Sequence, residues 1–163
     1  MKKYGIFYGS TTGTTRDVAQ RLARIMSINE TDVHNVADTA PDIVADYETL
    51  ILGSSTWGNG ELQDDWYDFL SGLKVLTLAG KRIAIFGVGD EKMSDTFCNA
   101  VAKIYNELQP TGADFIGDFN TEGYHYDHSD AARGGDALGL LLDETNHPEL
   151  TDTRLAQWAS GLK

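Results

Sequence analysis

The segment at residues 7–15, FYGSTTGTT, brings together five serine or threonine hydroxyls and two glycines without a lysine. A strand-like stretch leads into it and a stretch with helical periodicity follows, so we predict a turn from a strand into a helix. The unpaired N–H groups and the macrodipole at a helix N-terminus attract an anion without any formal positive charge. We therefore predict that this loop binds one phosphate group through neutral donors. A helix cap without a ligand is the alternative, but five hydroxyls exceed what one cap uses.

The absence of a lysine from this loop limits which phosphate-containing ligands it could bind. Nucleotide triphosphatases use G-x-x-x-x-G-K-[ST], whereas GSTTGTTR at residues 9–16 has a threonine where that lysine belongs. The loop is not G-x-G-x-x-G either, which removes support for a dinucleotide. A monophosphate ester is therefore the ligand that fits the loop best.

A second loop, GSSTWGNGELQDDW at residues 53–66, carries a tryptophan among glycines and polar residues. Trp57 is not placed there for core packing, and its indole suits the face of a planar ligand. A surface tryptophan packed locally is the alternative. Gly58 and Asn59 form the centre of a four-residue turn, for which type II′ and type II both remain open. The two forms differ mainly by a flip of the peptide at 58–59, so the turn can present either a carbonyl or an N–H group.

A third loop, GVGDEKMSDTFC at residues 87–98, can line the edge of a ring with backbone amides. Acidic residues gather in the second and third loops: Glu61, Asp64, Asp65, Asp68, Asp90, Glu91 and Asp95. Either they form a solvated rim, or their field resists the addition of negative charge to the ligand. His125 and His128 predict no metal site, because neither a cysteine nor a third histidine lies near them. Cys98 is interpreted as packing beside the ligand rather than as a thiol of low pKa.

Strand-like and helix-like stretches alternate along the chain, and they must position these loops. The strand-like runs lie at residues 2–9, 31–36, 48–55, 81–89, 113–119 and 138–143. Helical periodicity lies between most of them, and Thr151 is the expected N-cap of a last helix. Strands separated by helices imply βαβ crossovers and a mostly parallel sheet covered on both faces. Such sheets bind ligands at the carboxyl ends of their strands, so the three loops should lie side by side.

The bulk properties fit one domain over residues 1–163. The formal net charge of −12 disfavours nucleic acid and anionic membrane surfaces, and it favours encounter with a basic partner. No apolar run approaches the ~20 residues of a membrane helix, and we expect no export signal. Because Cys98 is the only cysteine, no intrachain disulfide is possible, and we expect a cytoplasmic protein.

Taken together, the three loops resemble those of flavodoxins, small electron carriers that bear flavin mononucleotide (FMN). IFYGSTTGTTRDVAQRL at residues 6–22 resembles their phosphate loop and first helix, and TWGNGELQDDW at residues 56–66 resembles their second loop. TEGYHYDHSDA at residues 121–131 and LGLLLDETNHPELTDTRLAQW at residues 138–158 are similar to the long-chain branch.

The resemblance implies a three-layer, doubly wound α/β fold with a five-stranded parallel sheet. The strand order 2-1-3-4-5 is an expectation from the family, and the residues alone do not show it. In the long-chain branch an insertion, here at about residues 120–137, splits the last strand.

The resemblance also implies which residues would hold FMN. The phosphate falls on residues 10–15, the ribityl or phosphate end near Thr56, and the inner ring face on Trp57. The flavin atom N5 falls beside Gly58 and Asn59. The full set of expected contacts is Ser10, Thr11, Thr12, Gly13, Thr14, Thr15, Ser55, Thr56, Trp57, Gly58, Asn59, Gly60, Gly89, Asp90, Met93 and Cys98.

The third loop departs from the family's pattern. Backbone amides at Asp90 and Cys98 fall near the pyrimidine edge of the ring, as the resemblance implies. The family usually places a tyrosine on the outer ring face, where this sequence has Met93. Either Met93 covers that face through its polarizable sulfur, or the face is more open, or Tyr124 or Tyr126 reaches over it.

The implied function is that of a low-potential one-electron carrier with no substrate and no catalytic residue of its own. It would shuttle electrons through the neutral semiquinone/hydroquinone couple of non-covalently bound FMN. The implied partners are flavin- or iron-sulfur-containing reductases and oxidoreductases with basic docking faces, and the carrier itself is expected to be a monomer.

Two other functions are alternatives to that of a carrier. An NAD(P)H-dependent FMN quinone or azo reductase of related fold needs a nicotinamide pocket, and the sequence offers no basic cluster for its phosphate. A phosphoacceptor signalling domain needs acidic residues after the first strand, where this chain has Gly9 and Ser10.

Overall fold

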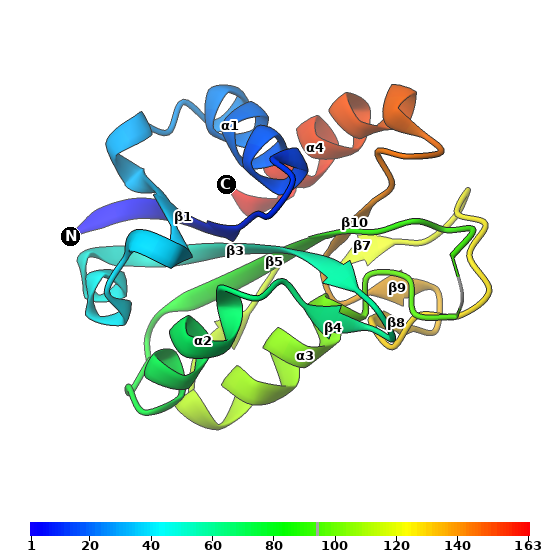
Figure 1. Ribbon diagram of the computed structural model, residues 1–163. Helices are drawn as coiled ribbons and strands as arrows, with labels where there is room; N and C mark the ends of the chain where they lie inside the picture. The colour runs from blue at the N-terminus through cyan, green and yellow to red at the C-terminus, as the bar shows by residue number, and fades with distance from the viewer. Residues whose placement is uncertain (94) are drawn as a thin grey trace.

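The computed structural model describes residues 1–93 and 95–163, and one parallel sheet runs through its middle (Figure 1). In the order β10-β5-β3-β1-β2, its strands are β10 (Leu140–Leu142), β5 (Arg82–Val88), β3 (Tyr47–Trp57), β1 (Lys2–Gly9) and β2 (Val33–Asn35). A further short strand, β6 (Asp114–Phe115), pairs with the start of β5, whereas β10 pairs with its end. The predicted order with a split last strand is therefore confirmed.

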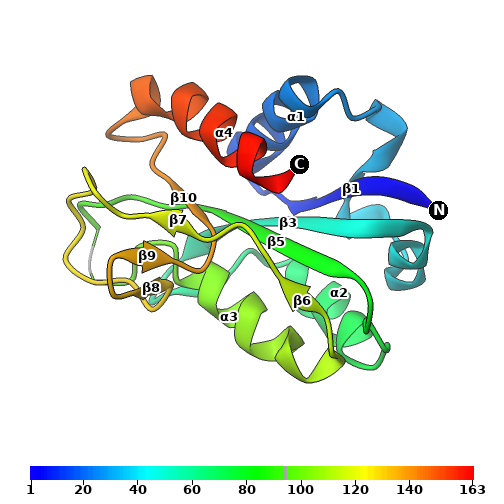
Figure 2. The same ribbon diagram turned by 180° about the vertical axis from the view of Figure 1, so that it is seen from behind.

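Helices cover both faces of the sheet, so the fold has three layers. In Figures 1 and 2, α1 (Thr14–Met26) and α4 (Pro148–Leu162) lie on one face, and α2 (Trp66–Lys74) and α3 (Asn99–Leu108) lie on the other. Short 3-10 helices in the described part of the chain occupy Glu30–Asp32, Val36–Asp38, Pro41–Asp46 and Gln109–Thr111.

The buried strands are apolar on both sides because each face meets a layer of helices. In β3, Leu50 and Leu52 join the hydrophobic cluster on the side of α2 and α3, while Ile51 between them joins the cluster on the side of α1 and α4. This alternation is the period of two that a strand imposes on its side chains. Two cores, one on each face, therefore hold the sheet in place.

The start of the last helix differs from the prediction. Thr151 is not its N-cap, because α4 begins at Pro148 with His147 in the capping position. Proline suits the first turn of a helix, where its missing N–H is not needed and its φ is already helical. Thr151 lies inside the helix, where its buried hydroxyl donates to Glu144 Oε2 over 2.8 Å.

The segment between β6 and β10 forms a small antiparallel sheet of its own. Its strands are β7 (Phe119–Asn120), β9 (Asp136–Ala137) and β8 (Ala132–Arg133), in the order β7-β9-β8. A two-residue strand, β4 (Glu61–Leu62), also folds back on the end of β3. Among the described residues, no helix combines the length and the apolar character needed to cross a membrane.

Candidate functional site

The three loops meet at the carboxyl edge of the sheet. Gly9 at the end of β1 pairs with Ser54 of β3, and Ser55 pairs with Val88 at the end of β5. The strands that feed the three loops are therefore immediate neighbours. The predicted side-by-side arrangement of the loops follows from this register.

The first loop leads into the N-terminus of α1. Gly13 takes a φ of +94° there, a left-handed conformation that favours glycine, and its N–H donates to Ser10 Oγ over 3.0 Å. The hydroxyls of Thr12 and Thr14 lie 3.4 Å apart, so donors gather at the helix start. One residue that the prediction did not include is Arg16. Its Nη2 lies 3.5 Å from the position that a Cβ on Gly13 would take, which brings a positive charge beside the loop.

Gln63 joins the first loop to the second. Its side chain is buried, and Nε2 donates to Thr11 Oγ1 over 3.1 Å and to Asp65 Oδ2 over 2.8 Å. Its Oε1 accepts from the backbone N–H of Asp65, and its own N–H donates to Ser54 Oγ. Sequence reasoning missed Gln63, because a glutamine among polar loop residues carries no signal until its partner 52 residues away is known.

The second loop holds Trp57 at the surface. The side chain is 42% exposed, and Nε1 donates to Ser55 Oγ over 2.7 Å. Trp57 pairs with Glu61 across a hairpin whose turn contains Gly58 and Asn59. Gly58 has a φ of +52°, whereas Asn59 is not among the residues with positive φ. These signs agree with the type II′ alternative and not with type II, which needs positive φ at the second position.

A slot of about 240 Å³ opens between the second and third loops. Its walls are formed by Thr56, Trp57, Gly58, Gly89, Asp90, Met93, Thr96, Phe97 and Cys98. A smaller hollow of about 160 Å³ lies between Thr11, Trp57 and Asp64. Trp57 borders both spaces, and Thr11 of the first loop borders the smaller one.

Two predicted contacts in the slot also have structural partners. Thr56 Oγ1 accepts from the N–H of Ala100 over 3.1 Å, so this hydroxyl helps to cap α3. Cys98 precedes α3 with a φ of +52° and is fully buried. Burial raises the pKa of its thiol, which supports the interpretation of Cys98 as a packing residue.

The structure distinguishes between the three side chains that could cover the outer side of the slot. Met93 borders the slot and is 67% exposed. Tyr124 is turned away, because its hydroxyl donates to Leu141 O over 2.6 Å and its ring lies under the guanidinium of Arg154. The ring of Tyr126 stacks on Phe97, with centroids 5.3 Å apart. Met93 is thus the one of the three side chains that borders the slot.

The insertion at about residues 120–137 makes hydrogen bonds to the C-terminal end of the third loop. Phe97 N–H donates to His128 O over 3.3 Å, and the hydroxyl of Ser129 donates to Phe97 O. Asn99 and Asp130 exchange two hydrogen bonds, at 2.8 and 3.1 Å. The insertion therefore fixes the residues at which the third loop enters α3.

The turn after β10 holds the other end of the third loop. Asn146 Nδ2 donates to Asp90 Oδ1 over 2.5 Å and to Asp143 Oδ2 over 2.8 Å. Burial alone would raise the pKa of the Asp143 carboxyl, but hydrogen bonds from Asn146, Glu91 and Thr145 hold this pKa below its usual range. Asp143 is therefore ionised, and its carboxylate accepts a hydrogen bond from the third loop at the N–H of Glu91.

The parallel sheet between two layers of helices, with loops gathered at its carboxyl edge, is that of a doubly wound α/β protein with a ligand cradle at the switch point. The family model described as flavodoxin matches residues 6–158. The chain therefore belongs to the flavodoxin family, whose members are electron-transfer proteins rather than substrate-converting enzymes.

Individual relatives agree with this assignment. "Flavodoxin 1" of Azotobacter vinelandii is 38% identical over 168 residues, which cover 100% of this chain and 97% of the relative. "Flavodoxin 1" of Escherichia coli K12 is 38% identical over 156 residues, 94% of this chain and 89% of the relative. Among solved structures, the Fusobacterium nucleatum flavodoxin bound to flavin mononucleotide has a TM-score of 0.89 and 30% identity, with 99% of this chain and 97% of that chain covered.

Proposed function

We propose that the protein binds one FMN molecule non-covalently and carries single electrons between redox enzymes through the neutral semiquinone/hydroquinone couple. The observation that supports this best is the position of Trp57, which borders both the slot and the hollow beside Thr11. A ligand with a flat ring in the slot and a phosphate at the first loop would lie beside Trp57 along this edge of the sheet. FMN supplies the one-electron chemistry when bound, and the chain sets the energies of its states.

The first loop is the proposed phosphate site. The donors are the hydroxyls and N–H groups of residues 10–15 at the positive end of the α1 dipole. Arg16 adds a formal charge that the sequence-based prediction did not require. Gln63 contributes indirectly, because it holds Thr11 in place.

The slot is the proposed ring site. We assign the inner ring face to Trp57 and the outer face to Met93, with the backbone of Gly89, Asp90 and Cys98 at the ring edge. We expect the peptide between residues 58 and 59 to present its carbonyl when the flavin atom N5 carries a proton and to turn away when it does not. Gly58 makes that change inexpensive, because type II′ and type II turns differ in the sign of φ at this position and a residue without Cβ takes either sign readily.

The negative charge of the surface should influence the reduction potential of the bound flavin. With a formal net charge of −12 and Asp64 at the hollow beside Trp57, added negative charge on the ring is disfavoured. We propose that this repulsion and the indole of Trp57 lower the potential for the second electron. The same field attracts partners with basic docking faces, which we propose are flavin- or iron-sulfur-containing reductases and oxidoreductases. We propose that the carrier works as a cytoplasmic monomer.

Steady NADPH oxidation separates a carrier from a reductase. The purified protein loaded with FMN is mixed with NADPH and a quinone or an azo dye, with and without an NADPH-dependent flavoprotein reductase. If the protein is a carrier, NADPH is oxidised only when the reductase is present. The rate of NADPH oxidation then falls as salt screens the charged docking faces. Sustained oxidation by the protein alone, without the reductase, contradicts the proposal.

A further inference from the structure

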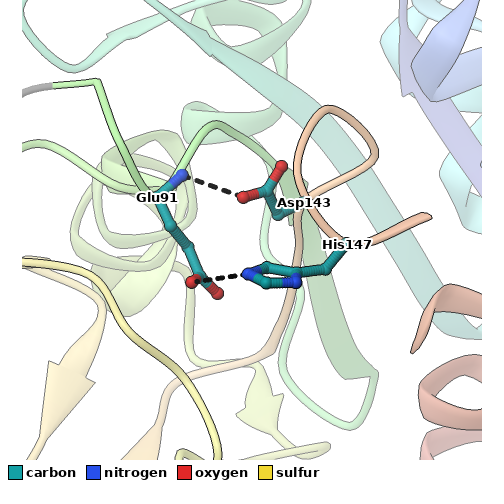
Figure 3. A group of neighbouring side chains, drawn as sticks. All are labelled: Glu91, Asp143 and His147. Carbon is teal, nitrogen blue, oxygen red and sulfur yellow. Dashed lines mark hydrogen bonds and ion pairs between the residues drawn. The ribbon is translucent and has the colours of Figure 1, made fainter. Parts of the chain in front are cut away.

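Glu91, Asp143 and His147 converge behind the third loop, although they come from three separate segments. Glu91 follows β5 in the third loop, Asp143 directly follows β10, and His147 caps α4. One side-chain oxygen or nitrogen of each lies within 4.8 Å of the corresponding atoms of the other two. Figure 3 shows the imidazole edge of His147 turned toward the carboxylate of Glu91, with Asp143 beside the Glu91 backbone nitrogen. The sequence predicted no metal site, and nothing in the spacing of these residues marks one.

The carboxylate of Glu91 is incompletely satisfied. The residue is only 4% exposed, and its Oε2 accepts from the backbone N–H of His125 over 3.1 Å. Its Oε1 is buried without a hydrogen-bond partner among the described residues. A buried carboxylate oxygen in that state is costly unless a positive group faces it. The arrangement therefore points to a cation.

The histidine is oriented as a ligand would be. His147 Nε2 lies 3.5 Å from Glu91 Oε2, and Nδ1 lies 3.5 Å from Glu149 Oε1 in the first turn of α4. A neutral imidazole carries only one proton, so the ring nitrogen that lacks it turns a lone pair toward a carboxylate. Two acceptors that face each other need a positive species between them. A histidine held by a carboxylate at its far nitrogen is the usual arrangement around a bound metal.

Asp143 has the fewest lone pairs to offer. Its Oδ1 accepts from the N–H groups of Thr145 and Asn146, and its Oδ2 accepts from Glu91 N–H and Asn146 Nδ2. These four bonds use the acceptor sites of a carboxylate. The bond from Asn146 Nδ2 is the most easily released, because it is the one of the four that comes from a side chain and not from the backbone.

We propose that Glu91, Asp143 and His147 bind one divalent transition-metal ion of the zinc class. One imidazole nitrogen with carboxylate oxygens suits Zn²⁺ better than Mg²⁺ or Ca²⁺, which prefer oxygen alone. The side chain of His147 is 29% exposed, so the ion has access from solvent and water completes its shell. Glu91 and His147 are the principal ligands, and Asp143 joins when Asn146 releases it.

The ion would tie the third loop to the turn before α4. Glu91 is adjacent to Asp90, which borders the slot. Binding would therefore stiffen the loop on the side away from Trp57. The proposed ion site shares no residue with the FMN contacts, so zinc binding is expected whether or not the flavin proposal holds.

Calorimetric titration with Zn²⁺ tests the site. The full chain, as purified and treated with chelator, is titrated with zinc chloride in a buffer without phosphate. We expect one ion per chain, no competition from an equal concentration of Mg²⁺, and binding at least about 10-fold weaker in His147→Gln and in Glu91→Gln. Glu149→Gln, which removes only the carboxylate at Nδ1, should weaken binding by about 10-fold. The matched control is His128→Gln, because His128 is also a histidine paired with a carboxylate, Asp130, but lies on the exposed insertion.

A second readout does not depend on the variants. The ring ¹⁵N signals of His147 should move in step with zinc up to one equivalent, with the larger change at Nε2. The proposal is wrong if the wild-type chain shows no saturable zinc binding, or if His147→Gln binds zinc as tightly as wild type. It is also wrong if the His147 ring takes up only a proton and zinc leaves its signals unchanged.

Discussion

The amide of Gln63 donates to the hydroxyl of Thr11 over 3.1 Å, and this bond links the loops that follow β1 and β3. The proposed phosphate site and the loop that carries Trp57 are thus positioned by one buried side chain. A change at Gln63 should be felt at the cofactor, although Gln63 is not among the proposed contacts.

Gln63→Glu should weaken FMN binding. The new carboxylate cannot donate to Thr11, and it faces the carboxylate of Asp65, which Gln63 now satisfies. A lost buried hydrogen bond with an unpaired partner costs about 1–3 kcal/mol, so we expect the Kd for FMN to rise about 10-fold to 100-fold. Fluorescence quenching of FMN by the apoprotein measures it. Gln109→Glu is the control, because Gln109 also donates to a hydroxyl, that of Tyr105, but lies just beyond the C-terminal end of α3. Equal Kd values for both variants would contradict the role of Gln63.

Gly58→Thr should lower the yield of the half-reduced form during stepwise reduction. A Cβ at Gly58 meets nothing within 4 Å, so the substitution acts through the φ of +52° and not through a clash. A β-branched residue is strained at that φ, whereas Asn tolerates it, so Gly58→Asn should keep a yield closer to that of wild type. The long-wavelength absorbance of the half-reduced protein measures the yield.

Gly80→Thr is the control for strain alone. Gly80 has a φ of +85° and equally open space around its Cβ, but it precedes β5 at the other edge of the sheet. It should destabilise the fold without changing the yield. If Gly58→Thr and Gly80→Thr have the same yield, the peptide at 58–59 does not respond to the flavin.

Asp64→Asn should raise the potential for the second electron. Asp64 is exposed at the hollow beside Trp57, so water screens its charge. We expect a rise of about 10–40 mV, on the scale of ~59 mV for each tenfold change in a one-electron equilibrium. Redox titration against reference dyes measures it, and the difference should shrink at high salt. Asp114→Asn, at the start of β6 beside Arg82, removes the same charge at the opposite end of β5 from the slot and should leave the potential closer to wild type.

The stability of the fold should fall at mildly acid pH because of His34. Tyr47 donates its proton to Asp32 Oδ1, so His34 Nε2 must donate to the Tyr47 oxygen, 2.7 Å away. Burial, against Phe7, lowers the pKa of His34 below its ordinary value of 6.5, a shift that the nearby Asp32 charge opposes. The neutral ring therefore stabilises the native state fully above about pH 6.5, and this contribution is lost as pH falls through the lower native pKa.

Urea unfolding of wild type and His34→Gln isolates that contribution. Glutamine can still donate to Tyr47 but does not titrate, so its urea midpoint should fall less between pH 7.5 and pH 5.5 than that of wild type. All other groups are shared and cancel in the comparison. Parallel curves for the two proteins would show that His34 does not carry the effect.

The sequence allowed most of the sheet to be predicted, because apolar runs and helical periodicity carry clear periods. The run at residues 48–55 became the central strand β3, and the hydroxyl-rich loop did lead into α1. What it did not predict are contacts between residues far apart in the chain. Gln63 with Thr11 and Asn146 with Asp90 join segments that no local pattern relates.

Short strands were not predicted from the sequence, for a different reason. The strands β4, β7, β8 and β9 have two residues each, too few to show any alternation. The start of α4 was misplaced because Thr151 matches the composition of an N-cap, while Pro148 three residues earlier already fixes the first turn. Composition therefore located the loops of the site, and only the packed chain showed what supports them.

The decisive measurement of FMN binding and one-electron chemistry is the visible spectrum of the purified protein during anaerobic stepwise reduction. We expect a yellow protein that turns blue after about one electron and then bleaches, with a second midpoint well below that of free flavin. A colourless protein that takes up no FMN, or one that passes from yellow to bleached in a single two-electron step, would contradict this expectation.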